Sequence, residues 1–188
     1  MRRTRNHDVE VDALTPFSDD SGVDTAPLWA LVAEQLTAAG ADLDALRSGA
    51  TEADIAAAEA ELGVPLPEDV RAIHRDHDGC SEALLDGREW LSLGRMVSEW
   101  RVWRDLLQRG CFEDAEPAPS GGVKPQWFNP LWIPVTHDGA GNHHCLDLDP
   151  GRGGVRGQVI ALRHDDPERV VVAGSLYAFL LMAEWGAR

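Results

Sequence analysis

Apolar residues recur at intervals of three and four through the first half of the chain, which is the period of an amphipathic helix. The sharpest of these stretches begins at Thr51, where Asp54 three residues later resembles a capping box, and Gly63 is placed to end it. The whole pattern predicts helices over residues 27–40, 51–62, 67–77 and 96–108. The first half of the chain is therefore expected to be mainly helical.

The second half changes to a period of two, the period of a β-strand with two different faces. Two sets of residues alternate there: His144, Leu146 and Leu148 with His143, Cys145, Asp147 and Asp149. The Asp-Gly-Ala-Gly-Asn run at 138–142 has turn chemistry, so residues 127–150 are predicted to form a β-hairpin with an acidic, imidazole-bearing face. Further strands are expected at residues 90–93, 157–163 and 169–173, and Ser175 can cap a final helix.

Helices first, then neighbouring short strands, then a closing helix indicate the α+β class. We expect a mostly antiparallel sheet, flanked by N-terminal helices and a C-terminal helix. Residues 27–188 are predicted to form a single domain, with a surface loop at 113–125. Residues 1–26 are polar and acidic, and we interpret them as a flexible tail.

The formal net charge of −15 is large for 188 residues. Such a field repels phosphate backbones and anionic membranes, so neither nucleic acid nor a membrane is a predicted partner. It attracts basic proteins, although acidity can also serve solubility alone. The three cysteines form no CxxC pair, no run reaches the length of a membrane span, and no secretory signal is visible. A cytoplasmic location is expected.

Several residues of the hairpin are potential metal ligands: His137, His143, His144, Cys145, Asp147 and Asp149. His143, Cys145 and Asp147 share one face of the expected strand, as a set of zinc ligands would. However, alternate residues of one strand are roughly 6.5–7 Å apart, so another element would have to contribute, and His74 and His77 are the candidates. The pattern favours surface or hydrogen-bonded side chains, and no metal or other cofactor is predicted.

Catalysis is disfavoured by similar arguments. A histidine on the strand of Cys145 would be beyond hydrogen-bond reach of the thiol. Asp147 and Asp149 could suggest acid–base chemistry, but neither sits in an obviously apolar sequence context that would raise its pKa. The Gly-rich run at 151–154 lacks the Lys-Ser/Thr of a phosphate loop. No catalytic residue is predicted, and the chain is not expected to be an enzyme.

The tryptophans and Phe128 leave two interpretations open. Trp100 and Trp103 have helical spacing that favours the core. Trp127, Phe128 and Trp132 can anchor the sheet or stand exposed as binding hot spots, and Trp127 is the one expected to be more exposed.

Four motifs carry a family resemblance: TEADIAAAEAELGVPLPEDVRAIHRDHDG at 51–79, WIPVTHDGAGNHHCLDLDP at 132–150, GVRGQVIALRHD at 154–165 and AGSLYAFLLMAEW at 173–185. In combination they resemble the SUKH superfamily, the Smi/Knr-type proteins that include fungal cell-wall-assembly regulators and bacterial toxin-immunity proteins. The resemblance spans about residues 27–188 and does not account for the segment before them. Many relatives look to have an aspartate where this chain has Asn142.

The resemblance implies a SUKH-like α+β domain that holds a protein partner on its sheet and adjoining loops, without catalysis. For a bacterial member it implies an immunity protein that neutralises a cognate toxin, such as a basic nuclease encoded nearby. The alternative is a regulatory or scaffold adaptor of the cell-wall-assembly type. We expect an acidic surface to steer the partner and Trp127 to hold it, the acidic residues being Asp138, Asp147, Asp149, Asp165 and Asp166.

Overall fold

The computed structural model describes residues 22–41, 43–80 and 82–186, so most of the expected tail lies outside the described residues. The helices within them are α1 (Ala26–Ala38), η1 (Leu43–Ala45), α2 (Glu52–Leu62), α3 (Glu68–Asp76), α4 (Leu93–Gln108) and α5 (Leu176–Met182). The strands are β1 (Glu89–Trp90), β2 (Ala118–Pro119), β3 (Trp132–Pro134), β4 (Thr136–His137), β5 (His143–Asp147), β6 (Gln158–Leu162) and β7 (Glu168–Ala173).

The strands form a five-stranded sheet in the order β2-β7-β6-β5-β3, and β1 pairs separately with β4. All neighbours are antiparallel except β2, which runs parallel to β7. The α+β class and the mostly antiparallel sheet are thus confirmed. Strand β2 was missed because it is two residues long and lies in the Pro- and Gly-containing stretch predicted to be a loop.

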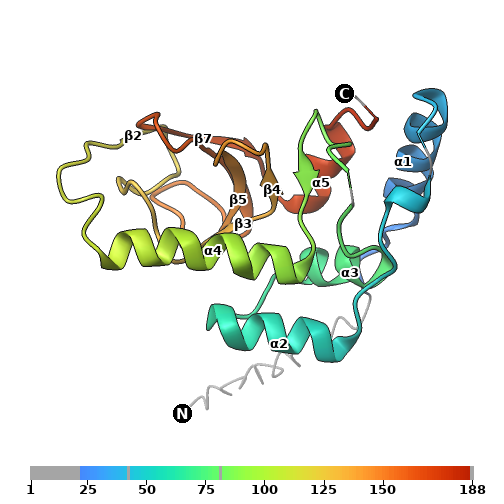
Figure 1. Ribbon diagram of the computed structural model, residues 1–188, viewed down its shortest axis with the longest axis horizontal. Helices are drawn as coiled ribbons and strands as arrows, with labels where there is room; N and C mark the ends of the chain where they lie inside the picture. The colour runs from blue at the N-terminus through green and yellow to red at the C-terminus, as the bar shows by residue number, and fades with distance from the viewer. Residues whose placement is uncertain (1–21, 42, 81, 187–188) are drawn as a thin grey trace, which may run out of the picture.

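The helices pack in two groups, one beside the sheet and one around α5 (Figure 1). Helix α4 runs alongside the sheet and contacts β3, with α2 packed against its other side. Helices α1 and α3 gather near α5, which joins them to β6 and β7. Within the described residues, no helix is both long enough and apolar enough to cross a membrane.

Local sequence signals explain the helix ends. The Thr51 hydroxyl accepts a hydrogen bond from the Asp54 amide, the Asp54 carboxylate accepts one from the Thr51 amide, and Gly63 ends α2 with a φ of 71°. Helix α4 begins earlier than expected because Ser92 is its N-cap. The strand predicted at 90–93 is therefore only β1.

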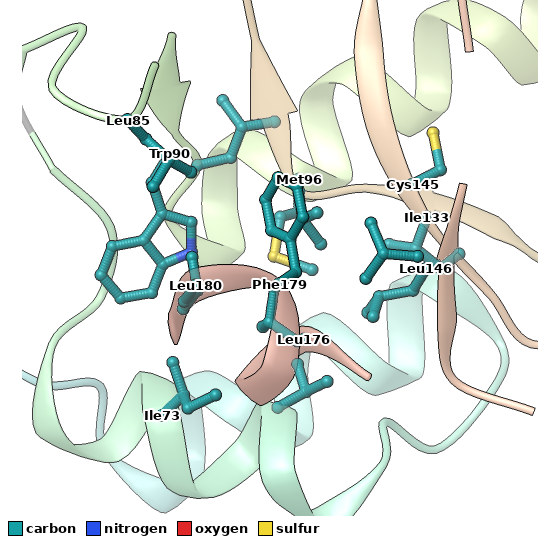
Figure 2. Close-up of a cluster of buried hydrophobic side chains, with 14 of the residues drawn as sticks. Ile73, Leu85, Trp90, Met96, Ile133, Cys145, Leu146, Leu176, Phe179 and Leu180 are labelled. Carbon is teal, nitrogen blue, oxygen red and sulfur yellow. The ribbon is translucent and has the colours of Figure 1, made fainter. Parts of the chain in front are cut away.

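The core lies between α5, α3, α4 and the sheet. Figure 2 shows Leu176, Phe179 and Leu180 of α5 between Trp90 on one side and Ile133 and Leu146 on the other. The predicted core positions Trp100 and Trp103 are each only 4% exposed, and Phe128 and Trp132 are buried as well. Most of the aromatic content therefore holds the fold together.

Candidate partner-binding surface

The residues proposed from the sequence as a partner-binding surface do not form one continuous patch. Asp138, Asp165 and Asp166 lie in the turns where β5 begins and β6 ends, whereas Asp147 and Asp149 lie where β5 ends. A strand rises about 3.3 Å per residue, so β5 alone separates the two groups by roughly 13 Å. The five aspartates therefore form two groups at opposite ends of β5, and their role in binding a partner stays a prediction.

Asp147 is fully buried, which corrects its assignment as a surface residue. Its Oδ1 accepts hydrogen bonds from the Trp132 indole N–H at 3.1 Å and the Asp149 amide at 3.0 Å. Its Oδ2 accepts one from the Gln158 side-chain amide at 2.8 Å. Burial raises the pKa of Asp147, and these bonds offset only part of that effect. The carboxylate joins β3, β5 and β6, so its role in this structure is internal.

Asp149 is half-buried and is held by neighbours within the chain. Its oxygens accept hydrogen bonds from the Lys124 ammonium at 2.5 Å and the Asn129 side-chain amide at 2.9 Å. The bond from Lys124, followed by that from Asn129, lowers the pKa of Asp149. Much of its charge is thus compensated inside the chain, which weakens it as a steering group.

Asp138 organises the turn between β4 and β5. It accepts hydrogen bonds from the amides of Ala140 and Asn142 and from the Asn142 side chain at 2.6 Å, and Arg88 lies 3.5 Å away. Burial alone would raise the pKa of Asp138, but these donors outweigh it and hold the pKa well below its usual range. Asn142 also accepts hydrogen bonds from His164, so the turn is tied to the end of β6.

Replacing Asp138 by asparagine is expected to destabilise the protein by about 1–2 kcal/mol at pH 7, because an amide would face the Asn142 amide and lose the charge. The depressed pKa stabilises the fold at pH values above the unfolded pKa of about 3.9, and this contribution is lost as the carboxylate becomes protonated. Urea unfolding should show that the difference in unfolding free energy between the wild type and Asp138→Asn is smaller at pH 3 than at pH 7. An equal difference at both pH values would contradict a lowered pKa for Asp138 in the folded protein. Asp165→Asn is the control, because the Asp165 side chain is exposed.

Asp165 is the most accessible of the predicted residues, with a side chain 73% exposed. Asp166 accepts a hydrogen bond from the Glu168 amide, which lowers its pKa, and pairs with Arg163 at 3.1 Å. Asp165, Asp166 and Asp138 together make this end of the sheet acidic. Asp138 also lines a neighbouring pocket of about 270 Å³, whose other lining residues are Glu82, Ala83, Gly87, Glu89, His137 and Gly139.

Trp127 is half-buried rather than exposed as a hot spot. The Arg169 guanidinium lies 4.9 Å from the centre of its ring and donates two hydrogen bonds to its carbonyl oxygen. Its position therefore depends on the fully buried Arg169. Sequence reasoning missed Arg169, which reads as an ordinary polar residue of an alternating strand.

The polar face predicted for β5 is covered as well. Cys145 is fully buried, and burial raises the pKa of its thiol, which removes it as a nucleophile. His143 lies 6.1 Å from the Trp103 ring, while His144 points to the other face and packs against Phe179. The alternating pattern correctly predicted that β5 has two different faces. However, helix α4 and the segment that carries Phe128 cover the face of His143, Cys145 and Asp147, which was expected to meet solvent.

A groove between α2 and α4 has no counterpart in the sequence prediction. Its volume is about 470 Å³. It is lined by Asp54, Ala57, Ala58, Glu61, Asp78, Ser92, Leu93, Gly94, Val97 and Arg101. Small side chains on α2 leave the groove open, and the salt bridge from Arg101 to Glu61, 2.7 Å long, crosses between the helices. The signal that could have found it is the run of alanines in α2.

The mostly antiparallel sheet, with α4 on one side and α5 linking it to the N-terminal helices, defines an α+β domain. The chain belongs to the SMI1 / KNR4 family (SUKH-1), whose model matches residues 49–182. The resemblance inferred from the four motifs is thereby confirmed.

Named relatives come from fungi. The chain is 27% identical to the "Cell wall assembly regulator SMI1" of Saccharomyces cerevisiae, over 94% of this chain and 43% of that protein. It is 34% identical to the "Cell wall biosynthesis/cell cycle regulator smi1" of Schizosaccharomyces pombe, over 73% of this chain and 31% of that protein. It is 28% identical to the "Glucan synthesis regulatory protein" of Neurospora crassa, over 74% of this chain and 34% of that protein. The chain thus spans less than half the length of these relatives, all named as regulators.

Proposed function

We propose that this chain is a non-catalytic regulatory domain that acts by binding a protein partner, in the manner of an adaptor. The observation that carries the proposal is its membership of a family whose matched proteins are named regulators of cell-wall assembly or glucan synthesis. This gives the adaptor reading precedence over the toxin-immunity reading favoured by the sequence. A reducing compartment such as the cytoplasm belongs to the same proposal, since Cys80, Cys111 and Cys145 are free thiols.

The groove between α2 and α4 is the surface that we assign to the partner. Its floor includes Ala58 and Val97, which are buried and apolar, and its rim carries Asp54, Glu61 and Arg101. An apolar floor with a charged rim is the usual anatomy of a protein interface. The groove lies within residues 49–182, the part that matches the family model.

Ala57 offers a direct test, because it is exposed on α2 and lines the groove. Ala57→Trp should fill the groove and reduce partner recovery at least about tenfold, the change that roughly 1.4 kcal/mol produces. The measurement is affinity capture of the tagged full chain from its native cells, with recovered proteins quantified by mass spectrometry.

Ala56→Trp is the matched control, because Ala56 is also exposed on α2 but does not line the groove. Recovery should follow the wild type in this variant. Equal recovery with Ala57→Trp and the wild type would remove the groove from the proposal. Equal losses in both variants would point to damage to α2 rather than to a blocked groove.

An immunity protein is the second candidate, and the net charge of −15 favours it because it suits a basic toxin. Co-expression with the product of the neighbouring reading frame separates the two. Rescue from a toxic neighbour together with a one-to-one complex would support immunity. A harmless neighbour and several weaker partners would support the adaptor.

A further inference from the structure

Three potential metal ligands from separate elements converge beside the sheet. Glu99 lies on α4, His137 on β4 and His143 on β5, and one ligand atom of each lies within 4.8 Å of the other two. In Figure 1 β4 and β5 lie next to α4, so the cluster joins the helix to both strands. Glu99 is 38 residues from His137 in sequence, which is why the hairpin pattern alone could not place it.

The hydrogen bond made by His143 determines where its lone pair points. Its Nδ1 lies 2.8 Å from the Thr136 carbonyl oxygen, and a carbonyl oxygen can only accept, so Nδ1 carries the proton. Nε2 then holds the lone pair and faces Glu99 Oε2 at 4.0 Å. A backbone carbonyl that fixes the ring in this way is typical of metal-binding histidines.

Glu99 is oriented by a second contact. Its Oε1 pairs with Arg95 at 2.8 Å, and Arg95 also reaches Glu89 at 3.5 Å. Oε2 is the oxygen that faces His143. Two electron-rich atoms thus face each other at a distance too long for a hydrogen bond, an arrangement that a bound cation would stabilise.

His137 forms the accessible side of the cluster. Its ring stacks on the His143 ring, with 5.1 Å between centroids, and lines the acidic pocket that also contains Glu89 and Asp138. The Gly139 amide donates a hydrogen bond of 3.3 Å to His137 Nδ1. The acidic pocket gives cations a route to the cluster.

We propose that Glu99, His137 and His143 bind one divalent transition-metal ion of the zinc class. Two imidazoles and one carboxylate are a known zinc ligand set, and the fourth position would face the pocket and hold water. Ligands of a tetrahedral zinc ion are about 3.4 Å apart, whereas the three ligand atoms lie within 4.8 Å of one another, so each distance would have to shorten by at most about 1.4 Å. The ion would tie α4 to β4 and β5. This proposal is independent of the regulatory role and of the groove.

The test uses the untagged full chain, freed of metal with a chelator and titrated with Zn²⁺ by calorimetry. One ion per chain is expected, with binding weakened at least about tenfold in Glu99→Gln and in His137→Ala. His143 is left unchanged because its ring is buried. Co²⁺ should give the intense visible absorption of a four-coordinate site in the wild type and lose it in both variants. Circular dichroism and urea midpoints of the metal-free proteins check that each variant is folded.

His164→Ala is the control, because His164 is 51% exposed and lies outside the cluster. Zinc and cobalt binding unchanged in this variant would complete the expected result. No zinc binding by the wild type at about 100 µM would overturn the proposal. So would binding that persists at full strength in Glu99→Gln and His137→Ala, or that falls equally in His164→Ala, since either result would place the ion on other surface groups.

Discussion

Replacing Asp147 by alanine is expected to lower the free energy of unfolding by about 3–5 kcal/mol. The substitution leaves three donors of a buried region without their acceptor: the Trp132 indole, the Asp149 amide and the Gln158 side chain. Each unsatisfied buried donor costs about 1–3 kcal/mol, and the losses are not fully additive. Since a domain is stable by only about 5–15 kcal/mol, this loss should lower the midpoint of urea unfolding by a readily measured amount.

Asp147→Asn tests the hydrogen-bond directions within the same network. An asparagine carries one N–H₂ group, which must face either the Gln158 amide or the two donors at Oδ1, so a donor meets a donor in either orientation. Gln158 is not free to turn, because it also donates to the Gly122 carbonyl and accepts from the Val155 amide. We expect a loss of about 1–3 kcal/mol. Asp165→Ala, on an exposed loop, should stay within about 0.5 kcal/mol, and an equally small effect for Asp147→Ala would show that the network is unimportant.

The helices and the fold class were predictable because their signals are local. Thr51, Asp54 and Gly63 specify both ends of α2 through bonds to near neighbours in sequence. The period-two pattern placed β5, and the strands expected at 157–163 and 169–173 correspond to β6 and β7. Four motifs in the right order were sufficient to identify the family, because they combine these local signals with their spacing.

The proposed binding residues were less predictable because burial is a property of tertiary packing. Alternation showed that His143, Cys145 and Asp147 share a face of β5, but no local signal reveals that α4 and Phe128 cover it. Acidic residues before a Pro-Gly turn are usually solvated, and Asp147 departs from that rule because three donors surround it. The groove and the Glu99 cluster both depend on α4, whose position no nearby sequence encodes.

Arg169→Ala is expected to destabilise the protein by about 3–4 kcal/mol and to loosen the segment around Trp127. The guanidinium donates to the carbonyl oxygens of Trp127, Asp166 and Glu168. Because the side chain is fully buried, these oxygens would lose their partners and the Trp127 ring would lose the cation over one face. Burial lowers the pKa of Arg169, but an arginine remains charged at neutral pH, so the carbonyls are solvating a true cation.

Lysine should not rescue the position, because one ammonium cannot reproduce a planar fork that reaches three carbonyls. Arg163→Ala is the matched control, because the Arg163 side chain is exposed and forms a surface ion pair with Asp166. We expect it to change stability by less than about 0.5 kcal/mol. Urea unfolding measures the global effect, and hydrogen exchange of residues 120–130 measures the local one. If Arg169→Ala left both at wild-type values, Trp127 would be held by its apolar neighbours rather than by the cation. If hydrogen exchange of residues 120–130 became faster while the free energy of unfolding barely fell, Arg169 would stabilise this segment locally and limit how far Trp127 can turn outward to meet a partner.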